Sequence, residues 1–170
     1  INPGTVMLMA RLAEQGKHKA AINTVGSSSL GRMLIRLFKS RGIKLINIVR
    51  KEKYVKELLQ EGADYVLVST EPDFEKKLEE IAKKEQATVT FDALGGDHTG
   101  KILKLLPEGS TVYVYDVLAG RYLNGIDVNE LLFKGKTLKS YSLTKYIFNS
   151  LNEEERAAFY KEFHSKLSGP

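Results

Sequence analysis

Apolar and polar positions recur along the chain in one order: a short apolar run, a turn, and a segment whose apolar residues repeat at helical spacing. The clearest helix is predicted over 28–41, because its apolar side chains fall on one face and Gly42 follows as a left-handed terminator. Further helices are predicted over 5–15, 51–61, from Pro72, over 97–106 and after Asn152, and strands over 20–25, 43–49, 65–68, 87–91, 111–115 and 137–143. The alternation predicts an α/β Rossmann fold: a doubly wound, parallel, six-stranded sheet in the order 3-2-1-4-5-6 with helices on both faces.

Composition narrows the class of protein. The chain has 170 residues, of which 42% are hydrophobic and 28% charged, and these values suit one globular domain with its own core. No apolar run is long enough to span a membrane, and the first residues lack the pattern of a secretory signal, so a targeting segment is expected to lie outside these residues. The absence of cysteine excludes disulfides and thiolate metal sites. The formal charge of +5 is spread along helices in which Lys alternates with Glu, so we expect no nucleic acid partner.

A Gly- and Ser-rich turn joins the first predicted strand to the clearest helix. The turn has the G-x-G-x-x-G spacing with Ser at the middle position, and its residues are Gly26, Ser27, Ser28, Ser29, Leu30 and Gly31. Gly26 would allow a sharp turn, Gly31 would let the helix pack closely, and Ser28 would leave room for a phosphate. Because helix N-terminal N–H groups face this turn, we predict that it holds the pyrophosphate of a dinucleotide. A plain strand–helix connection is the alternative interpretation.

The end of the second predicted strand indicates the type of cofactor. An acidic residue there would bind the ribose 2′-hydroxyl of NAD, but this chain has Arg50, followed by Lys51 and Lys53. A guanidinium can bind a 2′-phosphate through paired, charge-assisted hydrogen bonds. The cationic cluster therefore favours NADP(H) over NAD(H), with a solvated helix start as the alternative interpretation.

Six segments follow one another at spacings that are more specific together than any one motif: INPGT, AINTVGSSSLGRMLIRLFKSRGI, LINIVR, LLQEGADYVLVS, TFDALGG and LPEGSTVYVYDVLAG. This succession resembles the cofactor-binding domain of the medium-chain dehydrogenase/reductase superfamily, in its zinc-independent quinone oxidoreductase and enoyl reductase branch. The resemblance runs from Ile1 to about Leu167. It implies an NADP(H)-dependent oxidoreductase that transfers hydride to a quinone, an enone or an enoyl thioester.

The resemblance also implies roles for single residues. The turn 26–31 would cradle the pyrophosphate, and Arg50 with Lys53 would face the adenosine 2′-phosphate. Leu94 and Gly95 belong to a turn that would lie beside the nicotinamide ribose, and the loop after Tyr115 would pass near the nicotinamide. No catalytic residue and no metal ligand is implied within this chain.

A longer parent protein and a partner copy are implied in the same way. In the superfamily a catalytic domain precedes the helix that begins near Pro3, so residues 1–170 are expected to be the cofactor domain of a two-domain protein and to be inactive alone. The start at Ile1 instead of Met also indicates a piece of a longer chain. Thr137–Leu143 resembles the edge strand through which these proteins dimerise, so we expect a homodimer. We expect a cytoplasmic location, with mitochondria as the alternative.

Two departures and two alternative functions accompany this reading. Ser27, Ser28 and Ser29 stand where the superfamily usually has more Gly or Ala, and Asp116 stands where Gly is common; a carboxylate at this place would disfavour a phosphate or the carboxamide of the cofactor. Tyr141 and Lys145 have the Tyr-x-x-x-Lys spacing of short-chain dehydrogenases, whose chemistry needs both residues on one helix, whereas this stretch is predicted as strand and turn. A non-catalytic nucleotide-binding module is the other alternative, because it differs only in lacking turnover.

Overall fold

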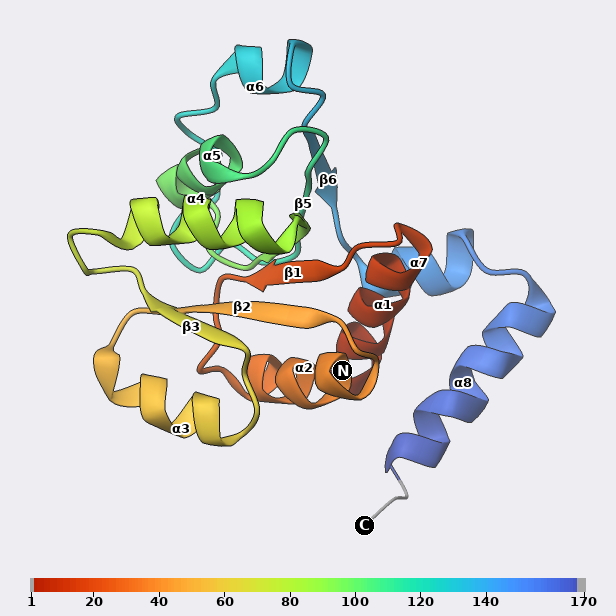
Figure 1. Cartoon of the computed structure of the whole chain (residues 1–170). Helices are drawn as coiled ribbons and strands as arrows, with labels where there is room; N and C mark the ends of the chain where they lie inside the picture. The colour runs from red at the N-terminus through yellow and green to blue at the C-terminus, as the bar shows by residue number, and fades with distance from the viewer. Residues whose placement is uncertain (1, 168–170) are drawn as a thin grey trace.

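One parallel sheet runs through the centre of the structure, a computed structural model that describes the backbone of residues 2–167 (Figure 1). Its strands are β1 (Ala20–Asn23), β2 (Lys44–Val49), β3 (Tyr65–Val68), β4 (Ala87–Asp92), β5 (Thr111–Val114) and β6 (Thr137–Ser140). They lie in the order β3-β2-β1-β4-β5-β6, and each pair of neighbours is parallel. The predicted fold class and strand order are therefore confirmed.

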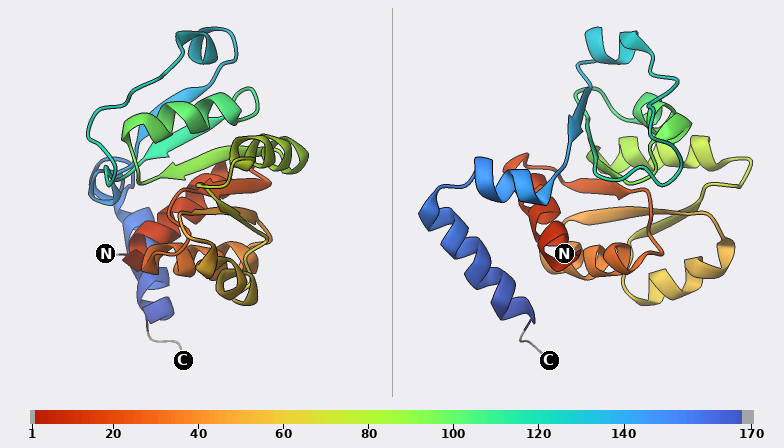
Figure 2. Two further views of the ribbon diagram at one scale, coloured as in Figure 1. Left: turned by 90° about the vertical axis from the view of Figure 1, so that its left-hand side faces the viewer. Right: turned by 180° about the vertical axis from the view of Figure 1, so that it is seen from behind.

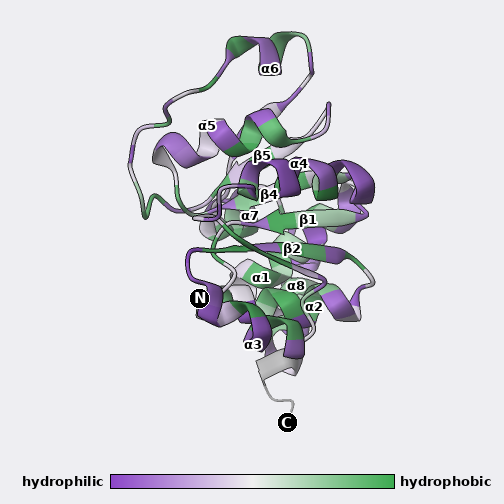
Figure 3. Cartoon of the chain, turned by 60° about the vertical axis from the view of Figure 1, so that its left-hand side comes forward, coloured by the Kyte–Doolittle hydropathy of each residue, from purple (hydrophilic) through white to green (hydrophobic). Residues whose placement is uncertain are grey.

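Helices cover both faces of the sheet (Figures 1 and 2). One face carries α1 (Asn2–Gln15), α2 (Ser29–Ser40) and α3 (Val55–Gln60), and the other carries α4 (Phe74–Glu85), α5 (Gly96–Leu105) and α6 (Val128–Leu132). Leu34, Phe38 and Leu58 belong to the core on the first face, whereas Leu78 and Leu103 belong to the core on the second. Each core forms because the apolar stripe of an amphipathic helix meets the apolar strands, which are mostly green in Figure 3.

Two further helices extend the layer that contains α1. α7 (Leu143–Asn149) and α8 (Glu153–Leu167) pack against α1 through a small apolar cluster that includes Met7, Ile147 and Phe159 (Figure 2). The start of α8 is a capping box, as the sequence predicted. The Asn152 side chain accepts from the Glu155 N–H at 2.8 Å, and the Glu155 carboxylate accepts from the Asn152 N–H at 2.9 Å.

Several predicted boundaries were wrong. The sixth strand ends at Ser140 rather than at Leu143, because Ser142 caps α7, which the sequence did not predict. α4 begins at Phe74 with Asp73 as its N-cap residue, so Pro72 does not open the helix. The predicted helix over 51–61 is divided into the 3₁₀ turn η1 (Glu52–Tyr54) and α3.

The short helix α6 was also not predicted, and a buried ion pair positions it. Lys136 donates to the Glu130 carboxylate at 2.5 Å and to the Leu103 carbonyl at the end of α5 at 2.8 Å. Both charged side chains are buried, so the pairing compensates for their loss of water. No helix in the described part of the chain is both long and apolar enough to cross a membrane.

Candidate functional site

The candidate site lies at the carboxyl ends of β1 and β4, where open α/β sheets have their ligand-binding crevice, and we call this place the crevice. These strands are neighbours at the centre of the sheet, but the helices that follow them, α2 and α5, lie on opposite faces. The chain therefore diverges at this point, and ligands of open α/β sheets bind where the strand order reverses. The predicted site segments 26–31, 50–53 and 94–95 all follow strands that end at this edge.

The turn after β1 is held mainly by Ser28, the N-cap residue of α2. Its hydroxyl accepts from the Gly31 N–H at 3.0 Å and donates to the Val25 carbonyl at 2.8 Å. The amides of Ser29 and Leu30, the first two residues of α2, have no acceptor among the described residues. Ser29 is exposed and Leu30 is half-buried. Two free amides at a helix N-terminus are suited to hold an anion.

Both glycines of this turn are required by crowding. A Cβ on Gly31 would lie 2.4 Å from the Gly26 carbonyl oxygen and 2.6 Å from that of Val25, so the helix does pack closely against the turn. A Cβ on Gly26 would lie 2.8 Å from the Asn47 Cβ on the neighbouring strand β2. Gly26 lies in a turn but is not among the residues with positive φ, so crowding against Asn47, and not a left-handed backbone conformation, requires glycine here.

The cationic segment after β2 lies next to this turn. The Gly26 N–H donates to the Ile48 carbonyl at 2.9 Å, and Arg50 follows two residues later. Arg50 is exposed, and its guanidinium forms no ion pair within the described part of the chain. Lys53 is exposed on η1, with its ammonium 5.0 Å from the centroid of the Tyr54 ring. The structure thus brings the two predicted cations to the same edge as the turn, and neither forms an ion pair with a carboxylate of the described residues.

The turn after β4 depends on a carboxylate that the sequence analysis did not single out. Asp92 is fully buried and accepts from the Thr24 hydroxyl at 3.0 Å, the Leu94 N–H at 2.9 Å and the Thr99 hydroxyl at 2.5 Å. Because Thr24 follows β1, Asp92 joins the two sides of the crevice. An acid at the end of an apolar strand is a signal that could have identified it, since a buried charge needs several partners.

A loop that follows β5 covers the turn with the predicted residues Leu94 and Gly95. The Ala119 N–H donates to the Leu94 carbonyl at 2.7 Å, and the Gly96 N–H donates to the Gly120 carbonyl at 3.0 Å. Gly95 has φ +66°, and a Cβ there would lie 2.4 Å from the Gly120 oxygen. Both the backbone conformation and the space therefore require glycine. Asp116, at the start of this loop, is exposed.

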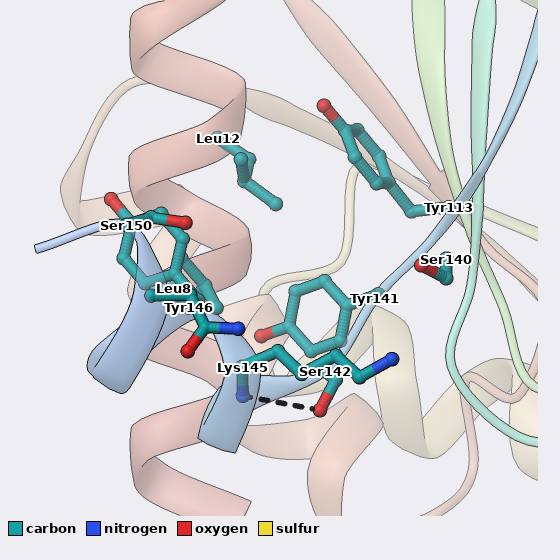
Figure 4. A pocket seen from close by; sticks show the side chains of 10 residues that line it. Leu8, Leu12, Tyr113, Ser140, Tyr141, Ser142, Lys145, Tyr146 and Ser150 are labelled. Atoms are coloured by element: carbon teal, nitrogen blue, oxygen red, sulfur yellow. Dashed lines mark hydrogen bonds between the residues drawn. The ribbon is translucent and has the colours of Figure 1, made fainter.

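Tyr141 and Lys145 do not form the arrangement of a short-chain dehydrogenase (Figure 4). Tyr141 precedes α7, whereas Lys145 lies within it, and the buried Tyr141 hydroxyl donates to the Thr5 carbonyl of α1. Burial raises the pKa of the Tyr141 phenol and also that of Tyr115, so both stay protonated at neutral pH. Neither can act as the base that this chemistry requires, and the short-chain alternative loses its support.

The geometry of the crevice and the topology of the sheet define a Rossmann-type domain. A family model described as zinc-binding dehydrogenase matches residues 29–160, and the chain belongs to this family. The proposed resemblance to the medium-chain dehydrogenase/reductase superfamily is thereby confirmed. The name of the family refers to zinc, yet the chain has no cysteine, and the described residues contain no group of three or more His, Cys, Asp or Glu that could hold a metal ion. The residues that the structure describes therefore offer no site for zinc.

Known proteins similar to this chain are reductases. A mitochondrial enoyl-[acyl-carrier-protein] reductase from Dictyostelium discoideum is 26% identical over 168 residues, which cover 94% of this chain and 47% of that protein. A candidate NADPH:quinone reductase from Mesorhizobium loti, solved as a crystal structure, matches with a TM-score of 0.87 and 27% identity over 99% of this chain and 50% of that one. Escherichia coli quinone oxidoreductase, solved with NADPH, shares the fold with a TM-score of 0.77 and 21% identity over 95% of this chain and 50% of that one. The chain thus spans about half the length of the relatives it matches.

Proposed function

We propose that this chain is the NADP(H)-binding domain of an oxidoreductase that transfers hydride to a quinone, an enone or an enoyl thioester. The observation that carries the proposal is the pair of amides of Ser29 and Leu30, which open α2 near the Arg50 guanidinium; among the described residues these amides have no acceptor and Arg50 has no ion pair. The helix N-terminus would bind the pyrophosphate of NADP(H). Arg50, two residues after the Ile48 carbonyl that holds the turn, would bind the 2′-phosphate. The similarity to enoyl and quinone reductases supports the reaction class.

Each part of the crevice has a role in this proposal. Residues 26–31 bind the pyrophosphate through backbone amides, while Arg50 and Lys53 bind the 2′-phosphate. Leu94 and Gly95 orient the nicotinamide ribose, in a turn that Asp92 keeps rigid. Asp116 lies at the nicotinamide end, where its charge would oppose a bound phosphate but not a neutral ring. The bound cofactor supplies the hydride from nicotinamide C4, and the chain contributes binding and orientation.

A titration tests the cofactor choice. Calorimetry at low ionic strength is expected to give about tenfold or stronger binding of NADPH than of NADH, since charge-assisted hydrogen bonds contribute roughly 1.5–3 kcal/mol when well made. Arg50→Ala should weaken NADPH binding and leave NADH binding nearly unchanged. Arg36→Ala, which removes an exposed guanidinium from α2, is the matched control and should change neither. Equal affinity of the unmutated chain for both cofactors would contradict the proposal.

The proposal includes a catalytic domain in a longer parent protein, because the relatives are about twice as long as this chain. The chain alone should therefore bind cofactor and should not reduce quinones or enoyl thioesters above background. A non-catalytic nucleotide-binding module would share the binding and differ in turnover. Assay of the full-length parent with NADPH and crotonyl-CoA or a quinone distinguishes the two, since only an oxidoreductase consumes NADPH.

The proposal also includes a homodimer that continues the sheet across β6. This strand pairs only with β5 among the described strands, and its Lys139 and Ser140 are exposed. Tyr141 and Leu143, which the sequence assigned to this edge, lie outside the strand: Tyr141 is buried, and Leu143 begins α7. Nearby apolar surface is instead provided by Leu132 and Phe133, which are 69% and 80% exposed.

Light scattering tests the dimer. The chain is expected to have the mass of two copies at high concentration. The Thr137 and Tyr141 N–H groups both bond to β5, so the Ser140 N–H faces the open edge, and Ser140→Pro should reduce this mass by removing a donor from the edge. A monomer at every concentration would contradict the dimer without affecting the cofactor proposal.

For the parent protein we propose a location in the cytoplasm or in mitochondria, and the names of the curated relatives favour mitochondria. Fluorescent tagging of the parent separates these locations.

A further inference from the structure

Arg32 crosses from the phosphate-binding helix to the helix that follows the cationic segment. It lies one turn into α2, and its guanidinium pairs with two carboxylates, that of Glu57 in α3 at 2.9 Å and that of Glu61, the C-cap residue of α3. The Arg32 side chain is only 22% exposed, so these contacts occur at a packed junction rather than in open solvent. Arg32 therefore links α2 to the carboxylates of Glu57 and Glu61.

One of these carboxylates, Glu57, has a second potential partner in the cationic segment. Glu57 lies four residues after Lys53, a spacing at which opposite charges pair along a helix. The two residues form no ion pair in the described part of the chain, because Glu57 turns to Arg32 and Lys53 lies over the Tyr54 ring. The hydrogen bond from Arg32 lowers the pKa of the Glu57 carboxyl, and the charge of Lys53 contributes less. Glu57 is therefore ionised, and Arg32 holds it.

We propose that Arg32 is a specificity-determining positioning residue that keeps the Glu57 carboxylate away from Lys53 and so preserves the positive charge offered to the 2′-phosphate. The proposal rests on the proposed function. Without Arg32, Glu57 is free to pair with Lys53, which would neutralise one cation and bring a carboxylate toward the phosphate. NADPH would then bind less tightly, whereas NADH, which lacks the 2′-phosphate, would be unaffected. Arg32 acts through Glu57 and not by contact with the cofactor.

The test compares Arg32→Met with the double variant Arg32→Met/Glu57→Gln in calorimetric titrations with NADPH and NADH. The single variant is expected to lower the ratio of NADPH to NADH affinity by about twofold to fivefold, the range for exposed or partly exposed ion pairs. The double variant is expected to restore the ratio, because the released carboxylate is gone. A mere loss of packing would not be repaired by Glu57→Gln. Equal weakening of both cofactors, or no rescue by Glu57→Gln, would overturn the proposal.

Two further variants control for charge and for folding. Arg36→Met removes another α2 guanidinium that faces Glu61 at 3.6 Å and should leave the ratio unchanged. If Arg32→Met does not fold, the cause would be the Glu61 carboxylate, which is the less exposed of the two acids and would be left without its Arg32 partner. Arg32→Met/Glu61→Gln removes that charge, leaves Glu57 released, and should show the same fall in the ratio. If the unmutated chain prefers NADPH and these variants do not alter the preference, this inference fails while the proposed function stands. A chain without any preference would contradict both.

Discussion

The two turns that flank the crevice follow neighbouring strands, yet different interactions hold them in shape. After β1, a single half-buried serine, Ser28, caps α2, and the amides of Ser29 and Leu30 have no acceptor among the described residues. After β4, the buried Asp92 carboxylate accepts from two hydroxyls and from backbone amides, and the loop 117–120 covers the turn. The first turn keeps hydrogen-bond donors available, whereas the second satisfies its donors internally.

Because of this difference, we expect the first turn to serve cofactor binding and the second turn to serve stability. Donors that point to solvent at a helix N-terminus can bind an anion without losing an internal partner. A buried carboxylate with several donors makes each hydrogen bond electrostatically strong, but it leaves all those donors unpaired if it is removed. Changes in the second turn should therefore reduce stability first, and changes in the first should reduce cofactor binding first.

The largest effect on stability is expected for Asp92→Ala. Removing the carboxylate leaves Thr24, Thr99 and the Leu94 amide without their acceptor in a buried place. The free energy of unfolding should fall by about 3 kcal/mol or more, because each hydrogen bond to a charged group contributes roughly 1.5–3 kcal/mol. Urea unfolding followed by circular dichroism measures the change.

Asp116→Ala is the matched control for this prediction. Asp116 is also an acid near the crevice, but it is exposed and accepts only from the adjacent Val117 N–H at 2.8 Å. Its loss should change stability by about 0.5 kcal/mol or less. If the two alanine variants were equally stable, Asp92 would not be the group that holds the second turn.

Gly31→Ala is expected to reduce stability less than Asp92→Ala does, and to reduce NADPH binding more. The added Cβ meets two backbone carbonyl oxygens, and backbone cannot move aside as a flexible side chain can. The turn must shift, which should cost about 1–3 kcal/mol of stability and weaken NADPH binding by roughly tenfold or more. Ser27→Ala, in the same turn, is the control. It should leave the free energy of unfolding nearly unchanged and should change NADPH affinity by about twofold or less. Unchanged NADPH affinity in Gly31→Ala would show that the turn is not the pyrophosphate site.

The same comparison explains how much could be read from the sequence. The first turn was predicted because its determinants, Gly26, Ser28 and Gly31, lie within six residues, and Ser28 and Gly31 act on the backbone of the turn itself. The crowding of Gly26 against Asn47 of β2 became apparent only in the fold. The importance of Asp92 was missed because two of its partners, Thr24 and Thr99, come from separate segments that only the folded sheet brings together. Helix α6 was missed for a similar reason, since its position depends on the buried Lys136 contacting the end of α5. The parallel sheet was predictable because strand–helix alternation favours it, and the observed strand order is the one typical of dinucleotide-binding sheets.

The smallest effect is expected for Ser28→Ala, which removes the cap of α2. The Gly31 amide loses its acceptor and the Val25 carbonyl loses a donor, but Ser28 is half-buried, so water can replace part of both contacts. The free energy of unfolding should fall by about 1 kcal/mol, and NADPH should bind about twofold to fivefold more weakly because the helix start is less fixed. Ser28→Thr keeps a hydroxyl that can cap and should recover most of the stability. Ser29→Ala, one residue into the helix and exposed, should have no measurable effect on stability. If Ser28→Ala behaved like Ser29→Ala in urea unfolding and in calorimetry, the hydroxyl of Ser28 would not be what holds the first turn, and its shape would have to come from the two glycines alone.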